Sequence, residues 1–145
     1  MGKLTTAIFN AITGQNAVLA MYPAAVAGAG TAPIGTVVAD GGANTFAACT
    51  SFVAVGIIAV EYWFCQVQIG AASVAETFVC DVMNPIDVTS IYSFRCGISA
   101  VTANIAAFGP PFPIRCAPST AIGARTASNS GTDSLTLSLL LATGL

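Results

Sequence analysis

The sequence predicts an all-β fold, an antiparallel β-sandwich of about eight strands that is jelly-roll-like. Apolar and polar residues alternate along five segments between residue 62 and the C-terminus, and Gly, Pro, Asn and Ser separate these segments. Alternation with a period of two turns one face of a strand toward a core and the other outward. At 145 residues the chain is long enough for one domain with a two-layer core.

The alternation also predicts which side chains point inward. Those of the five segments are Trp63, Cys65, Val67, Ile69; Phe78, Cys80, Val82; Tyr92, Phe94, Cys96, Ile98; Phe112, Ile114, Cys116; and Leu135, Leu137, Leu139, Leu141. Gln66, Asp81 and Arg95 fall between them and are expected on the opposite face.

The predicted strands follow from these segments and from the turn residues between them. They cover residues 36–39, 45–60 (which Gly56 could divide in two), 61–69, 76–83, 89–100, 112–116, 121–127 and 134–142. Asn84-Pro85 and Gly109-Pro110-Pro111 mark strong turns. We therefore assign residues 36–145 to a β-sandwich domain.

Residues 1–35 are expected to form an extended N-terminal arm. They are rich in Ala, Gly and Thr, with a short helix possible over residues 4–12. Such a segment has too few large apolar residues for a core of its own. We expect it to lie along a neighbouring subunit or back across its own domain, and a passive tail is the alternative. Ala25-Val26-Ala27 resembles a leader cleavage motif, but polar residues such as Asn10 interrupt the apolar stretch before it. We expect mature protein made in the cytoplasm.

The composition favours a surface that other protein covers. Only 7% of residues are charged, against about 25% in typical soluble domains, and mean hydropathy is +0.82. Residues 41–60 are uncharged and could span a bilayer as a helix. However, no Lys or Arg flanks them, and their strongly apolar part is only strand-length. We expect a strand there and no membrane partner.

Charges and cysteines exclude two further classes of partner. The basic residues Lys3, Arg95, Arg115 and Arg125 are scattered and the net charge is −2, so we expect no nucleic-acid binding. The five cysteines are Cys49, Cys65, Cys80, Cys96 and Cys116. Their wide spacing and the absence of histidine give no metal-binding or redox motif. They are reduced core thiols or, alternatively, form disulfides across the sandwich.

No residue is predicted to be catalytic, to bind a cofactor or to bind a metal. The chain has no histidine, no nucleophile elbow and no nucleotide-binding glycine motif. The six acids, Asp40, Glu61, Glu76, Asp81, Asp87 and Asp133, fall on different predicted strands and loops. Glu76 is expected to accept backbone hydrogen bonds at a turn. Arg125 is expected to pair with a carboxylate or to reach across an interface. We therefore expect no enzyme and no cofactor.

Three stretches stand in a recognisable order. The first, Ala43-Asn44-Thr45-Phe46, runs into the apolar residues 52–60. The second, Ile69-Gly70-Ala71-Ala72-Ser73, leads to Glu76 and Phe78-Val79. The third joins Pro113-Ile114 and Pro118-Ser119-Thr120 to Ile122-Gly123-Ala124-Arg125 and a leucine-rich final strand. Over about residues 40 to 145, this order resembles a family of small β-sandwich structural proteins of tailed bacteriophages.

The resemblance implies a virion component without cofactor or catalytic residues. Ser119 stands where the family pattern usually has Gly, and Ala121 where it usually has Arg, so the contacts of such an Arg are in doubt. The expected function is a capsid decoration (cement) protein that stabilises subunit junctions of a phage head. The expected partners are the major capsid protein or other virion proteins, and a homo-oligomer in a symmetric assembly.

Three alternatives remain open. The chain could be a tail-associated or fibre-associated virion protein. It could be a self-assembling extracellular filament or surface subunit, in which the arm or Val37-Val38 completes a neighbour's sandwich. It could also be a membrane-embedded protein that uses residues 41–60.

Overall fold

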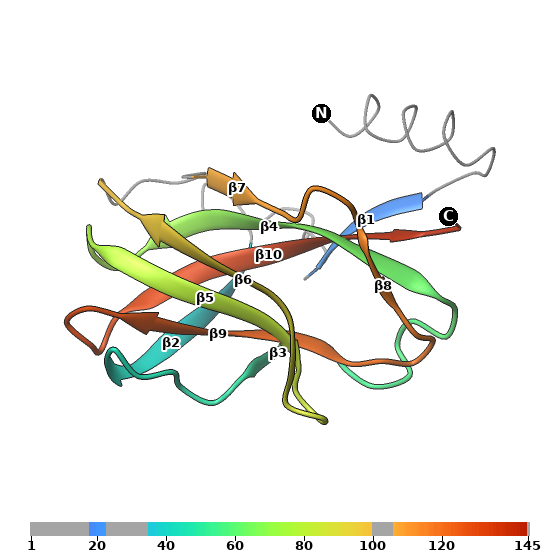
Figure 1. Cartoon of the computed structure of the whole chain (residues 1–145), viewed down its shortest axis with the longest axis horizontal. Coiled ribbons are helices and arrows are strands. Elements are labelled where there is room, and N and C mark those ends of the chain that lie inside the picture. The colour runs from blue at the N-terminus through green and yellow to red at the C-terminus, as the bar shows by residue number, and fades with distance from the viewer. Residues whose placement is uncertain (1–17, 23–34, 100–105, 145) are drawn as a thin grey trace, which may run out of the picture.

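The computed structural model describes residues 18–22, 35–99 and 106–144, which form ten strands and an all-β, jelly-roll-like antiparallel β-sandwich (Figure 1). The strands are β1 Val18–Tyr22, β2 Thr36–Ala43, β3 Thr50–Val53, β4 Tyr62–Ala72, β5 Thr77–Asn84, β6 Thr89–Gly97, β7 Ala106–Phe108, β8 Ile114–Cys116, β9 Ile122–Ser128 and β10 Ser134–Thr143. Within the described ranges there is no helix with the length and apolarity that a membrane crossing requires.

The strands belong to one hydrogen-bonded sheet that curls over a shared core. Its order is β6-β5-β9-β2-β10-β4-β7, with β1 on β10, β3 on β9 and β8 on β4. β2 connects the part of the sheet that contains β10 and β4 with the part that contains β9 and β5. Its first half, from Thr36 to Ala39, pairs with β10. Asp40 and Ala43, farther along β2, pair instead with β9, in parallel. All the other strand pairs are antiparallel.

The inward rows of β5 and β10 are as predicted. Phe78, Cys80 and Val82 are completely buried, and so are the four leucines of the β10 row. Cys96 and Ile98 are buried, while Tyr92 and Phe94 pack against the core. These rows are uninterrupted in sequence, so a strict period of two placed them correctly.

The prediction for the first half of β4 was wrong. Tyr62 and Phe64 are fully buried, whereas Trp63 and Cys65 are only half-buried. Leu140 lies opposite Gln66 and Leu141 opposite Phe64, which leaves Cys65 as an extra residue in the ladder. Such a bulge reverses the alternation before it. Beyond the bulge, Val67 and Ile69 point inward as predicted.

Two other expectations require correction. Phe112, predicted to be inside, is 80% exposed. It lies between Pro111 and Pro113, neither of which can donate to a strand ladder, and β8 begins only at Ile114. The predicted strand over residues 45–60 shrinks to β3, and after β3 the chain turns: the Ile57 N–H donates to the Ala54 carbonyl, and Gly56 within this turn has a φ of 80°. This turn is held by backbone hydrogen bonds that join Gly56 to Ser119 and Ser119 to Ile58.

Two strands, β1 and β7, were not predicted. β1 lies within the expected arm, and it pairs with β10 of its own chain from Val18–Thr143 to Tyr22–Leu139. This part of the arm therefore lies across its own domain. The helix expected over residues 4–12 lies outside the described residues.

Aromatic side chains close the sandwich where its hydrogen-bonded order ends. β6 and β7 stand at opposite ends of the strand order, yet the Phe94 and Phe108 rings stack with centroids 4.6 Å apart. Tyr92 stacks on Phe94 at 5.7 Å and lies 5.8 Å from Phe64 of β4. This row of rings seals the core at the opening between β6 and β4.

We expect Phe64→Ala to lower the free energy of unfolding by about 3–5 kcal/mol, because it removes the fully buried ring at one end of this row. Phe112→Ala, at an exposed ring, should change it by less than about 0.5 kcal/mol. Urea unfolding followed by Trp63 fluorescence measures both. Equal effects of the two substitutions would contradict the aromatic closure.

Candidate functional site

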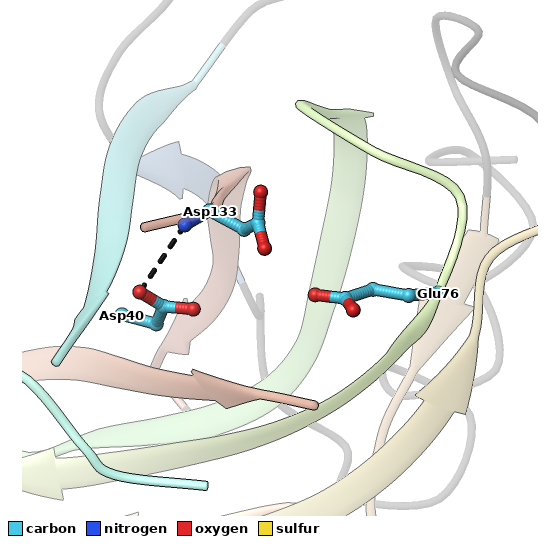
Figure 2. A group of neighbouring side chains, drawn as sticks. All are labelled: Asp40, Glu76 and Asp133. Atoms are coloured by element: carbon cyan, nitrogen blue, oxygen red, sulfur yellow. Dashed lines mark hydrogen bonds between the residues drawn. The ribbon is translucent and has the colours of Figure 1, made fainter. Parts of the chain in front are cut away.

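Three carboxylates that are far apart in sequence meet at one end of the sandwich. Asp40, Glu76 and Asp133 each offer an oxygen, and these oxygens lie within 4.8 Å of one another (Figure 2). All three residues are half-buried. We call them the acidic cluster.

Strand direction brings the acidic cluster together. Asp40 lies where β2 leaves β10 for β9, since Ala39 pairs with Ser134 and Asp40 with Thr126. Glu76 directly precedes β5 and Asp133 directly precedes β10. Both of these strands run antiparallel to β9, so both begin where β9 ends. The three acids therefore share the end of the sandwich that holds the β9–β10 connection.

Serine hydroxyls and backbone amides hold the two aspartates. Oδ1 of Asp40 accepts hydrogen bonds from the backbone N–H of Gly42 at 3.3 Å and of Asp133 at 3.2 Å. The Ser128 hydroxyl donates to Oδ2 of Asp40 and in turn accepts from the backbone N–H of Gly131 at 3.0 Å. The end of β2 is thus fixed to the β9–β10 connection.

Hydrogen-bond donors are scarce around Glu76. The Ser130 hydroxyl lies 2.8 Å from Oε2 of Glu76 and also 2.8 Å from Oδ2 of Asp133, but it has only one proton to donate. Oε1 of Glu76 is buried and has no hydrogen-bond partner among the residues that the structure describes. As expected for a turn residue, Glu76 accepts a backbone hydrogen bond, from the Ile98 N–H to its carbonyl at 2.8 Å, while its carboxylate accepts from a hydroxyl.

No positive charge balances the acidic cluster within the part of the chain that the structure describes. The two ion pairs found there are Arg115–Glu61 and Arg125–Asp81. Carboxylate and hydroxyl oxygens are the ligands that hard divalent cations prefer. The chain has no histidine that could activate Ser128 or Ser130 as a nucleophile. The arrangement therefore suits cation binding better than acyl transfer.

From the sequence we predicted no metal ligand and did not group these acids. One signal was available, because Glu76 begins a predicted strand and Asp133 stands directly before another. Grouping them with Asp40 also requires knowing that β2 crosses between β10 and β9, and alternation does not reveal strand order.

Asp81 of β5 lies outside the acidic cluster, and both oxygens of its carboxylate have hydrogen-bond or ion-pair partners. Its Oδ2 lies 2.9 Å from the Arg125 guanidinium, as expected for Arg125, and its Oδ1 accepts from the hydroxyls of Ser90 and Ser93 at 2.5 and 2.7 Å. The Phe46 ring covers Arg125, with the guanidinium carbon 4.6 Å from the ring centroid. Asp81 is 3% exposed, so this group holds β5, β6 and β9 together and leaves no open site.

The five cysteines are free thiols. Cys80, Cys96 and Cys116 are buried, and Cys49 and Cys65 are half-buried. Burial raises the pKa of the Cys65 and Cys96 thiols to about 11, so both are protonated at neutral pH. The buried thiols pack as small apolar side chains, as one of the two sequence interpretations expected.

The opposite end of the β5–β9 pair is apolar. Met83 of β5 lies opposite Gly123 of β9, so the loop after β5 projects near the start of β9. The loop before β4 is hydrogen-bonded to the same region through Ser119. These two loops expose five large aliphatic side chains, one of them Val60. We call the other four the apolar end: Val55 (56% exposed), Ile57 (65%), Ile86 (62%) and Val88 (65%).

No protein-family model matches the chain, and no curated protein matches it. A solved structure of infectious bursal disease virus, Gx strain, is similar with a TM-score of 0.33 and 10% identity, over 88% of this chain and 32% of the virus chain. The Gt strain gives 0.24 and 11%, over 90% and 31%. The chain thus spans about a third of the length of these virus chains.

We expect Arg125→Met to lower the free energy of unfolding by about 2–3 kcal/mol, because it strands the buried Asp81 carboxylate without its cation. Arg115→Met removes the same group from a solvent-exposed pair and should lower the free energy of unfolding far less. Thermal and urea unfolding of both variants measures the difference. A cost for Arg115→Met that matched that of Arg125→Met would contradict this role for burial.

Proposed function

We propose that the chain is a non-enzymatic structural protein of a virion, and more specifically a decoration protein on the head of a tailed bacteriophage. In this role it binds across junctions between copies of the major capsid protein. The observation that carries the proposal is the apolar end, where Val55, Ile57, Ile86 and Val88 are all more than half exposed.

Burial of the apolar end would supply the binding energy. A large aliphatic side chain that leaves water on docking contributes about 1.5–3 kcal/mol. Four such side chains lie on two loops that both project near the start of β9, and a few well-buried side chains dominate the energy of protein interfaces. With 7% charged residues in the chain, such an interface would depend only weakly on salt.

Symmetry would multiply the effect of a modest contact. A particle presents many identical junctions, and several copies of the chain around one junction would each use the same apolar end. The resemblance of residues 40–145 to small β-sandwich proteins of tailed phages supports this setting.

Strand pairing within the chain favours docking over filament formation. Val37 and Val38, which could have completed a neighbour's sandwich, pair with Thr136 and Leu135 of their own β10. β1 occupies the next part of the same edge. Both strands are hydrogen-bonded to β10 of their own chain. A filament built by donating either strand to a neighbour would first have to break these hydrogen bonds.

The test is binding of the purified chain to heads of its parent phage that lack it, measured by co-sedimentation, with separated tails as a second target. We expect binding to heads. The double variant Ile57→Asp/Ile86→Asp should bind at least about 100-fold more weakly, since two anchors of about 1.5–3 kcal/mol each are lost.

Val37→Asp is the matched control, because Val37 is 61% exposed but lies on β2, away from the apolar end. It should bind as the unmodified chain does. Binding to tails alone would favour the tail-associated alternative. Binding to heads that the double variant leaves unchanged would refute the role of the apolar end.

A further inference from the structure

We propose that the acidic cluster of Asp40, Glu76 and Asp133 binds a calcium ion. The proposal does not depend on the particle that the protein joins. From the sequence alone, no metal ligand was expected.

The first observation that points to a ligand is the state of Glu76. Its Oε1 atom is inaccessible to solvent and has no hydrogen-bond partner among the residues that the structure describes. A buried carboxylate oxygen without a donor is strongly unfavourable, and such an atom calls for an ion or a bound molecule. Figure 2 shows the carboxyl group of Glu76 pointing toward Asp40 and Asp133.

The second observation is the balance of protons around the aspartates. Ser130 stands at hydrogen-bond distance from both Glu76 and Asp133 with one proton to give. The Ser73 hydroxyl reaches Oδ1 of Asp133 only at 3.5 Å. Ser130 can therefore serve only one of these two carboxylates at a time, whereas Asp40 accepts hydrogen bonds at both of its oxygens. A divalent cation would bind oxygens of all three acids at once and offset the repulsion between the carboxylates.

The atom types and the number of carboxylates favour calcium. Calcium takes six to eight oxygen ligands at about 2.3–2.6 Å in flexible geometry. The cluster offers three carboxylates whose oxygens lie within 4.8 Å of one another. Magnesium demands near-ideal octahedral geometry, keeps several of its waters and is usually bound through only one or two carboxylates. Hydroxyl oxygens and water can complete a calcium shell of variable number.

An ion in this position would join three separate parts of the chain. Asp40 belongs to the crossing strand β2, Glu76 ends the β4–β5 connection, and Asp133 ends the β9–β10 connection. Calcium would therefore hold these three segments together at the end of the sandwich that carries the acidic cluster, which we call the polar end. Because the unfolded chain cannot hold the three acids together, binding would stabilise the folded state.

The experiment is thermal unfolding of the full chain after EGTA treatment, with CaCl2 or MgCl2 added back, and isothermal titration calorimetry with CaCl2. At a free Ca²⁺ concentration about 100 times the Kd, the midpoint should rise by about 5–10 °C. MgCl2 at the same concentration should give a clearly smaller rise. No midpoint shift and no heat of binding with Ca²⁺ would overturn the proposal.

Glu76→Gln keeps the hydrogen bond to Ser130 but removes the charge, and it should abolish the Ca²⁺-dependent rise. Asp133→Asn is a second variant with the same expected result, should Glu76→Gln fail to fold. Glu61→Gln is the matched control, because Glu61 is an acid outside the cluster, paired with Arg115. It should keep the full rise. A rise that persists in both cluster variants would place Ca²⁺ elsewhere and refute the site.

Discussion

The leucine row of β10 is the interaction on which the rest of the structure depends. Leu135, Leu137, Leu139 and Leu141 are at most 1% exposed, and the strand that carries them pairs with β4 along nearly its whole length. On its other edge β10 pairs first with β2 and then with β1. One strand thus supplies the centre of the core and the ladder on which three others assemble. With few charges available, burial of such rows provides most of the stability.

The pairing of β2 with β10 also determines the chemistry of one end. β2 can follow β10 only as far as Ser134, because the chain before that residue turns back toward β9. There β2 moves to β9, and this crossing places the Asp40 carboxylate beside Asp133 and Ser128. At the opposite end of the sandwich, where β5 ends and β9 begins, the neighbouring loops expose aliphatic side chains. The molecule therefore has a polar end suited to a cation and an apolar end suited to a protein surface.

The sequence predicted the inward-pointing side chains correctly where the alternation along a strand is not broken by a bulge. The rows of β5 and β10 were predicted correctly because no bulge breaks their alternation. Trp63 and Cys65 were misplaced because a bulge depends on the partner strand, here at Leu140 and Leu141. Phe112 was misplaced because the prolines around it exclude it from the ladder. The acidic cluster was missed for a related reason, since its three residues meet only through the order of strands in the sheet.

Hydrogen exchange of individual backbone amides, with Ca²⁺ or with EGTA, tests the central claim that a cation fastens the polar end. The N–H groups of Gly42, Gly131 and Asp133 bond to Asp40 or Ser128, so their exchange should slow markedly when Ca²⁺ is present. The N–H groups of Gly56 and Ser119, at the apolar end, should change far less and serve as an internal reference. Exchange at Gly42, Gly131 and Asp133 that Ca²⁺ leaves unaltered, or that slows no more than at Gly56 and Ser119, would contradict the account.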